Sequence, residues 1–143
     1  MARQIPEGYH SVTPYVTVDR AREFIDFLKA AFDATAPEVL TDEEGNIRHA
    51  EAQIGDSRVM IGQARGEWKV RPATLYLYLP DVDATYKRAL AAGATSLMEP
   101  SDQFYGDRNG GVEDPFGNWW WLATRIEDVA PDELQRRMAA QAK

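Results

Sequence analysis

The sequence predicts a single α+β domain built from two similar halves. A strand pattern followed by an amphipathic helix pattern occurs twice along the 143 residues. Both helix patterns run into the same dipeptide, at Ala34-Thr35 and again 60 residues later at Ala94-Thr95. A chain of this length is typical of one domain and can bury a sizeable core. We therefore expect an internal repeat within one domain, residues 1–143.

The first half, residues 10–64, has the pattern of a βαβββ module. An alternating strand runs from Val12 to Val18, and Asp19 is placed to cap the helix that follows. That helix carries one apolar stripe, as expected for a helix that packs on a sheet. Three shorter strands are then expected, at Val39-Leu40, Ile47 to Ile54 and Arg58 to Gly62.

The second half, residues 73–125, repeats this order. A strand from Thr74 to Leu79 precedes a helix that Asp81 is expected to cap. The turn from Asp114 to Asn118 separates the last two strands, with its Asp and Asn side chains bonding the local backbone. A last helix, residues 131–140, is expected to serve packing or dimer contacts. The three later strands of this half are expected at Ser96 to Met98, Arg108 to Glu113 and Trp119 to Thr124.

The composition limits the compartment and the partners. The sequence has no cysteine, which excludes disulfides, thiolate metal ligands and a cysteine nucleophile. A formal net charge of -7 disfavours a nucleic-acid partner, because binding of the phosphate backbone requires a basic surface. The longest apolar stretch is too short for a membrane span, and the polar start does not resemble a signal peptide. We expect a soluble cytoplasmic protein without membrane or nucleic-acid partners.

Alternation along each strand predicts one aliphatic face and one mixed face. In the first strand Val12, Val16 and Val18 are expected to face the helices, while Tyr15 faces the other way. A mixed face is solvated by default, yet monomers rarely expose large contiguous apolar patches. We therefore expect a pocket for a small molecule there. The candidate ligand-binding residues on the mixed faces are Tyr15, His49, Glu51, Gln53, Met60, Tyr76 and Tyr78.

Three consecutive tryptophans, Trp119 to Trp121, suit the stacking of a planar aromatic ligand. Alternation does not allow all three to line one pocket. We expect Trp120 in the core and both Trp119 and Trp121 in the pocket. A dimer interface is the alternative for these two.

Several motifs together resemble the vicinal oxygen chelate superfamily, which includes glyoxalase I, extradiol dioxygenases and the bleomycin-resistance proteins. The most specific is Tyr105-Gly106-Asp107-Arg108 followed by Gly111-Val112-Glu113-Asp114-Pro115-Phe116-Gly117-Asn118-Trp119-Trp120, which is similar to the signature of the PhnB-like branch. The run Arg48-His49-Ala50-Glu51 with Ile54-Gly55-Asp56 resembles the same branch. The resemblance covers nearly the whole chain. It implies paired βαβββ modules whose mixed sheet curls around a cavity, commonly completed across a homodimer.

In metal-dependent members of this family, the ligands come from the first and last strands of each module. The resemblance places Thr13, Met60, Thr74 and Trp121 at these positions. None of these side chains is a good ligand for a divalent metal. We therefore expect no cofactor, with an atypical divalent metal site at His10 or His49 as the alternative.

His49 and Glu51 are the candidate catalytic residues, because a histidine beside a carboxylate can act as a general base near neutral pH. For His49, a hydrogen bond to a ligand, a structural contact between strands and simple solvation are the alternatives. Arg108 is a candidate for binding an acidic group of a ligand, with a structural salt bridge as its alternative.

Together these features favour a metal-free binding protein of the glyoxalase/bleomycin-resistance type, in which a homodimer sequesters a hydrophobic or aromatic small molecule. The first alternative is an enzyme. It would be a lyase or isomerase of the glyoxalase kind with an atypical metal site, or an acid-base catalyst built on His49 and Glu51. The second alternative is a structural or regulatory partner whose own aromatic side chains fill the pocket.

Overall fold

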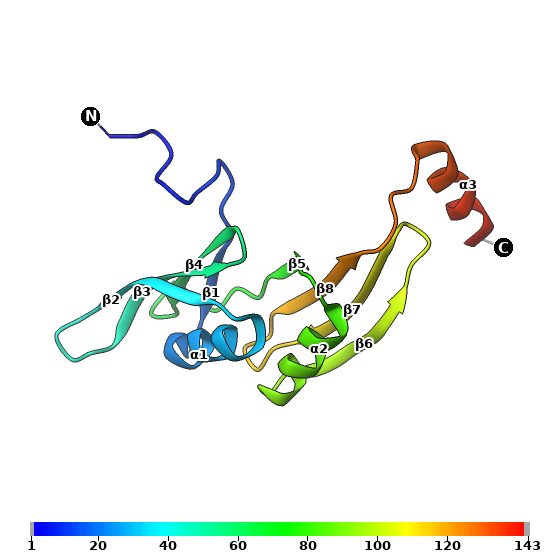
Figure 1. Cartoon of the computed structure of the whole chain (residues 1–143). Helices are drawn as coiled ribbons and strands as arrows, with labels where there is room; N and C mark the ends of the chain where they lie inside the picture. The colour runs from blue at the N-terminus through cyan, green and yellow to red at the C-terminus, as the bar shows by residue number, and fades with distance from the viewer. Residues whose placement is uncertain (1, 142–143) are drawn as a thin grey trace.

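The structure, a computed structural model, describes residues 2–141, which form two consecutive βαβββ modules and a C-terminal helix (Figure 1). The first module consists of β1 (Tyr15–Val18), α1 (Ala21–Phe32), β2 (Thr35–Thr41), β3 (Ile47–Ile54) and β4 (Ser57–Gln63). The second consists of β5 (Thr74–Tyr78), α2 (Val82–Ala91), β6 (Thr95–Asp102), β7 (Asp107–Glu113) and β8 (Trp119–Arg125). Helix α3 (Pro131–Gln141) follows β8.

Each module forms its own four-stranded mixed sheet. The strand order is β1-β4-β3-β2 in the first sheet and β5-β8-β7-β6 in the second. In both sheets the first strand pairs parallel with the last, and the other neighbours are antiparallel. The predicted α+β class and repeated module are thus confirmed. Within residues 2–141 the two sheets are not closed into one barrel, so a single chain does not enclose the expected central cavity.

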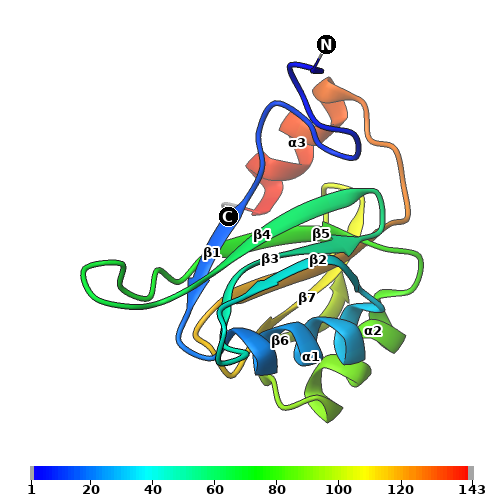
Figure 2. The same ribbon diagram turned by 90° about the vertical axis from the view of Figure 1, so that its left-hand side faces the viewer.

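Helices α1 and α2 lie side by side on one side of the two sheets (Figures 1 and 2). Arg88 of α2 links them, because its guanidinium donates two hydrogen bonds, of 3.2 and 3.0 Å, to the carbonyl oxygen of Ala30 in α1. The N-terminal segment and α3 extend on the other side of the sheets (Figure 2). Each sheet therefore has one face against a helix and one face turned away from α1 and α2.

The core lies between these helices and the aliphatic faces of the strands, as alternation predicts. Val16 and Val18 of β1 are fully buried in one cluster with Phe24 of α1. Trp120 of β8 is 1% exposed, which confirms its predicted place in the core. Its ring lies 4.7 Å from the ring of Phe32 in α1, so the core is continuous between the two modules.

Three strand predictions need correction. Strand β6 spans Thr95–Asp102 and is longer than the predicted Ser96 to Met98. Val12 is 85% exposed rather than buried, because β1 begins only at Tyr15. Strand β2 spans seven residues, Thr35–Thr41, and is longer than the predicted Val39-Leu40. It is an edge strand that is exposed along nearly its whole length, and an exposed strand shows no apolar alternation that would mark its ends.

The two helices begin differently. Asp81 caps α2 as predicted, with its carboxylate accepting an amide of the first turn at 3.1 Å. The predicted cap of α1 is wrong, because its N-cap residue is Arg20 and not Asp19. Gln63 of β4 takes over this task, since its side-chain oxygen accepts the amide of Ala21 at 3.0 Å.

A buried carboxylate organises the turn between β7 and β8. Asp114 is 3% exposed and accepts hydrogen bonds from the amides of Phe116 and Asn118, at 2.8 and 2.9 Å. It also accepts the indole N–H of Trp120 at 2.9 Å. Asn118 in turn accepts the amide of Ala73 at 2.9 Å, just before β5. The predicted local bonding of this turn is confirmed, and the turn also joins β8 to β5.

Asp114→Ala should lower the free energy of unfolding by about 3 kcal/mol, because it leaves buried amide and indole N–H groups without an acceptor. Chemical denaturation followed by tryptophan fluorescence measures this loss.

The matched control is Asp56→Ala in the corresponding turn of the first module. Asp56 is exposed and its carboxylate bonds the neighbouring Ser57 hydroxyl at 2.9 Å. This control should shift stability by no more than about 0.5 kcal/mol. Equal losses in the two variants would contradict the role assigned to Asp114.

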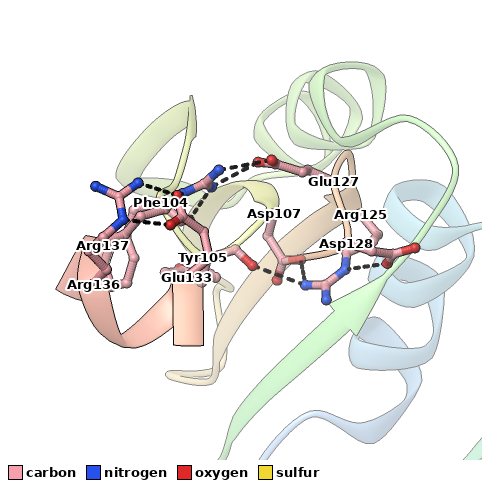
Figure 3. A network of polar contacts seen from close by, with 9 residues as sticks. All are labelled: Phe104, Tyr105, Asp107, Arg125, Glu127, Asp128, Glu133, Arg136 and Arg137. Carbon is pink, nitrogen blue, oxygen red and sulfur yellow. Dashed lines mark hydrogen bonds and ion pairs between the residues drawn. The ribbon is translucent and has the colours of Figure 1, made fainter. Parts of the chain in front are cut away.

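Arg137 holds α3 to the rest of the chain (Figure 3). Its guanidinium donates to both carboxylate oxygens of Glu127 at 2.9 Å and to the carbonyl oxygen of Phe104 at 2.9 Å. The hydrogen bond from Arg137 holds the pKa of Glu127 below its ordinary value, and bonds from Arg136 and Arg137 do the same for Glu133. The attachment of α3 therefore depends on carboxylates that are charged.

Arg137→Gln should release α3 while the sheets stay folded, so backbone amides of residues 131–141 should exchange hydrogen several-fold faster at neutral pH. Because the pKa values of Glu127 and Glu133 are depressed in the folded chain, their contribution is present above the ordinary glutamate pKa and is lost as pH falls through the depressed values. The wild-type helix should therefore also loosen in acid. Hydrogen exchange read by mass spectrometry tests both expectations.

Arg136→Gln is the control, since Arg136 bonds Glu133 within α3 itself, at 2.7 and 2.5 Å. If hydrogen exchange in α3 rises equally in Arg136→Gln and Arg137→Gln, the faster exchange is due to the lost positive charge on the helix. It is then not due to the lost contacts of Arg137 with Glu127 and Phe104.

Candidate functional site

The second sheet presents an aromatic face on the side turned away from the helices. We use this name for Tyr76 and Tyr78 of β5 with Trp119 and Trp121 of β8. In the sheet register Tyr76 lies beside Trp121, and Tyr78 lies beside Ala123. Because Ala123 is small, the tyrosine side chains can reach across it toward β7. Three of the four rings are exposed, and Trp121 is half-buried.

The two tryptophans of this face have fixed positions. Their ring centroids are 6.4 Å apart and the planes meet at 89°, an edge-to-face arrangement. The indole N–H of Trp119 donates to Glu113 of β7 at 2.8 Å. The ring of Trp121 lies over Gly111, where an added Cβ would overlap it. The glycine in the predicted signature thus makes room for a tryptophan.

Asp107 of β7 is the charged floor of the aromatic face. It is 2% exposed and accepts hydrogen bonds from the hydroxyls of Tyr76 and Tyr78, at 2.6 and 2.9 Å. Arg125 donates a third bond at 3.2 Å (Figure 3). Burial acts to raise the pKa of Asp107, but the bonds from Tyr76, Tyr78 and Arg125 outweigh it and lower that pKa. At neutral pH the carboxylate is therefore charged.

The tyrosines respond in the opposite sense. Burial, followed by the bond to Asp107, raises the pKa of Tyr76, and the bond to Asp107 is the main cause that raises the pKa of Tyr78. Both hydroxyls thus keep their protons at neutral pH. They act as hydrogen-bond donors to Asp107 and not as bases.

Asn109 lies next to this carboxylate on the same face of β7. Its side-chain Nδ2 donates to the hydroxyls of Tyr76 and Tyr105, at 3.0 and 2.6 Å. Asn109 is 3% exposed, and its Oδ1 has no hydrogen-bond partner among residues 2–141. Sequence reasoning did not select Asp107, Asn109 or Tyr105 as site residues. Alternation from Asp107, within the signature already noted, would have placed Asp107 and Asn109 on one face.

The corresponding face of the first sheet is polar and largely paired. Glu51 of β3 accepts the hydroxyl of Tyr9 and lies 3.5 Å from Arg58. His49 is half-buried, with its Nε2 3.7 Å from a Glu51 oxygen. Arg58 also donates to the side chain of Gln53. The Glu51 carboxylate is therefore contacted by three side chains, those of Tyr9, Arg58 and His49.

Tyr9 reaches this cluster from the N-terminal segment, where no strand or helix pattern pointed to it. Burial, followed by the bond to Glu51, raises the pKa of Tyr9 to about 12. The guanidinium of Arg58 lies 5.4 Å from the centre of its ring. The segment before β1 is thus bonded to the polar face of the first sheet.

Arg108 does not lie with the other candidate ligand-binding residues. It points to the helix side of the second sheet, as alternation from Asp107 requires. There it makes two bonds of 2.9 Å to Asp83 of α2 and one of 3.0 Å to Asp102. We therefore correct its assignment, because its guanidinium fork is occupied by a structural salt bridge.

The other predicted site residues fall into two separate groups, one on each module. On the first module, the ring of Tyr15 lies 5.9 Å from the ring of His49. Met60 of β4 is the register partner of Tyr15 in β1. The first group is Tyr15, His49, Glu51, Gln53 and Met60. The second is Tyr76, Tyr78, Trp119 and Trp121.

The positions at which the family resemblance places metal ligands carry no imidazole or carboxylate side chain. Thr13 and Met60 belong to the first module, and Thr74 and Trp121 to the second. No group of three or more His, Cys, Asp or Glu residues within residues 2–141 is arranged to hold a metal ion. The donor set therefore does not fit a catalytic divalent metal, which needs several imidazole or carboxylate ligands on one centre.

Two hollows of the single chain reach the aromatic face only through its tyrosines, because Tyr76 lines both and Tyr78 lines the larger one. A cavity of about 170 Å³ between the modules is lined by apolar side chains that include Ile54, Leu75 and Leu77. It is smaller than the roughly 300–1,000 Å³ typical of small-molecule pockets. A hollow of about 850 Å³ opens beside α2. Neither is lined by Trp119 or Trp121, so the tryptophan half of the aromatic face lies outside both hollows.

As for membranes, the described helices, all within residues 2–141, include none of the length and apolar character needed to span a bilayer.

Comparison with known proteins identifies relatives along most of the chain. The family model of the Glyoxalase/Bleomycin resistance protein/Dioxygenase superfamily matches residues 8–122. The uncharacterized protein Mb0911c of Mycobacterium bovis is 37% identical over 142 residues, covering 92% of this chain and 93% of its own length. The uncharacterized protein Rv0887c of Mycobacterium tuberculosis shows the same identity, with 92% and 84% covered.

Solved structures show the same fold at lower identity. TioX from Micromonospora sp. ML1 has a TM-score of 0.69 and 21% identity, covering 85% of this chain and all (100%) of its own. A PhnB protein from Bacillus cereus has a TM-score of 0.65 and 19% identity, with 80% and 99% covered. The repeated βαβββ order, the signature around the second sheet and the matched family model agree, and this chain belongs to the glyoxalase/bleomycin resistance protein/dioxygenase superfamily.

Proposed function

We propose that this protein binds a planar aromatic or hydrophobic small molecule on the aromatic face of the second module, without a metal. The observation that carries the proposal is the grouping of Tyr76, Tyr78, Trp119 and Trp121 on one side of one sheet, with exposed fractions of 45%, 59% and 43% for the first three. Such a contiguous apolar patch marks a binding surface in soluble proteins. Stacking and apolar burial would supply the affinity.

We also propose that a second copy of this chain covers the face. Each sheet turns one face away from α1 and α2, and Tyr15 on the first sheet is exposed as well, at 56%. In such a homodimer, the polar face of one copy's first sheet would lie over the aromatic face of the other copy's second sheet. The pocket between them would be lined by polar side chains on one side and aromatic side chains on the other. Light scattering should then give twice the chain mass, and a strictly monomeric protein would refute the pairing.

The donor set at the family's ligand positions supports binding without a metal. The side chains of Thr13, Met60, Thr74 and Trp121 offer no imidazole or carboxylate. Sequestration needs no chemical step, so affinity from apolar burial is sufficient for it.

An acid-base enzyme is the second candidate, favoured by the 3.7 Å contact of His49 with Glu51. The engagement of Glu51 by Tyr9 and Arg58 weighs against it, because a general base must be free to take a proton. Stoichiometric divalent metal bound through His49 in the purified protein would reverse this ranking in favour of a metal enzyme.

A panel of acridine, phenazine and naphthalene should quench tryptophan fluorescence with at least one saturable curve. Trp121→Leu should weaken that binding by about 2- to 13-fold, because one aromatic contact contributes roughly 0.5–1.5 kcal/mol beyond its buried area. Titration calorimetry measures both affinities.

The matched control is Trp68→Leu. Trp68 is 68% exposed in the segment between the modules, outside the aromatic face. Its replacement should leave the affinity within about two-fold. If none of the three compounds binds the wild-type protein, the proposed function is refuted.

A further inference from the structure

The unpaired amide oxygen of Asn109 is the least explained polar atom beneath the aromatic face. Buried polar atoms nearly always find a partner, because an unsatisfied one costs roughly 1–3 kcal/mol. Here Oδ1 is buried and has no partner within residues 2–141. Such an atom beneath a surface built for binding indicates a partner that arrives with the ligand.

The hydrogen-bond network settles which way the amide faces. Tyr76 already donates its only hydroxyl hydrogen to Asp107, at 2.6 Å. Asn109 must therefore present an N–H to that hydroxyl, which it does at 3.0 Å. With the amide turned over, Oδ1 of Asn109 would face the hydroxyl oxygen of Tyr76, and both atoms are acceptors in that contact. The free atom is thus an oxygen, and it accepts hydrogen bonds.

A donor stands next to this acceptor. The hydroxyl of Tyr105 accepts a bond of 2.6 Å from the same Asn109 amide, which leaves its own hydrogen available to donate. The Asn109 side chain therefore carries the free acceptor, Oδ1, and also holds the free donor, the Tyr105 hydroxyl, in place. A ligand hydroxyl complements this pair, because it both donates and accepts.

The charge around the pair excludes other ligand groups. Asp107 lies beside Asn109 and is ionised, so a ligand carboxylate or phosphate would meet a like charge. A ligand cation would find the carboxylate already bonded to two tyrosines and to Arg125. The group that suits the site is therefore neutral.

We propose that Asn109 and Tyr105 select aromatic ligands that carry a hydroxyl, with a phenol as the ligand class. The ligand hydroxyl donates to Oδ1 of Asn109 and accepts from Tyr105, while its ring lies against the aromatic face. Since Oδ1 is covered in the free protein, entry displaces one of the covering side chains. This inference rests on the proposed function, because it names the chemistry of the ligand that the aromatic face binds.

Three probes of nearly one shape test it by calorimetry: a naphthol, the methoxynaphthalene with oxygen at the same position, and naphthalene. The wild-type protein should bind the naphthol about 2- to 13-fold more tightly than methoxynaphthalene, the range expected for one added neutral hydrogen bond, and should bind naphthalene most weakly. Methoxynaphthalene keeps the acceptor for Tyr105 but has no donor for Oδ1 of Asn109, so its affinity should lie between those of the other two probes.

Asn109→Leu should remove the preference for the naphthol over methoxynaphthalene, and Tyr105→Phe should reduce the preference for both oxygen-bearing probes over naphthalene. Naphthalene itself should still bind both variants. Tyr86→Phe is the matched control, since the Tyr86 hydroxyl bonds Ser96 at 2.5 Å and Tyr86 belongs to α2, on the helix side of the sheet. It should keep the full preference. If Asn109→Leu does not fold, Tyr105→Phe decides alone, because it removes one oxygen from a half-buried side chain.

The outcomes separate the two proposals. Equal affinity of the wild-type protein for all three probes overturns the phenol assignment and leaves the proposed function standing. A naphthol preference over naphthalene that is unchanged in Tyr105→Phe and in a folded Asn109→Leu also overturns it. If none of the three naphthalene probes binds while acridine or phenazine does, the phenol assignment is overturned and the proposed function stands. If acridine and phenazine fail as well, both are overturned.

Discussion

A single helix covers one face of each four-stranded sheet in the described chain, and the rest of the molecule follows from this constraint. The covered faces take the aliphatic side chains and form one core, joined between the modules by Trp120 and Phe32. The opposite faces then carry whatever the alternating positions hold. In the second module those positions are aromatic, so exposed rings are a consequence of the same alternation that builds the core.

The two modules share one architecture but use their open faces differently. On the first sheet the ionic groups neutralise one another, with Glu51 bonded by Tyr9 and approached by Arg58 and His49. On the second sheet one carboxylate, Asp107, is buried under the rings. The first face thus offers a saturated polar wall. The second offers apolar area with a polar floor, which is the combination that binding pockets use.

Much of this arrangement was predictable from the sequence because alternation is a local property. It placed Trp120 inside and put Tyr76 and Tyr78 on one face with no knowledge of the partner strands. What it missed depends on neighbours far along the chain. The start of α1 is capped by Gln63, 42 residues away, and no pattern near Asp19 reports this. Edge strand β2 and the segment holding Tyr9 carried no periodic signal.

The site was partly hidden for the same reason. Arg108 offered a free guanidinium in the sequence, but the fold brings Asp83 of α2 against it from 25 residues away. Its neighbour Asp107 has the opposite parity and so lies under the tyrosines. Two adjacent residues of β7 therefore have different roles: Arg108 forms a structural ion pair on the helix side, and Asp107 lies beneath the aromatic face on the other side.

The polar floor changes what the aromatic face can discriminate. Stacking on tryptophan and tyrosine rewards any flat apolar molecule and separates ligands mainly by size. A buried amide with one unused acceptor adds direction, because only a ligand that brings a donor relieves the cost of leaving that acceptor unpaired. Since Asp107 is fully engaged and Asn109 is held by two tyrosine hydroxyls, this direction is built into the rigid strand β7 and not into a loop.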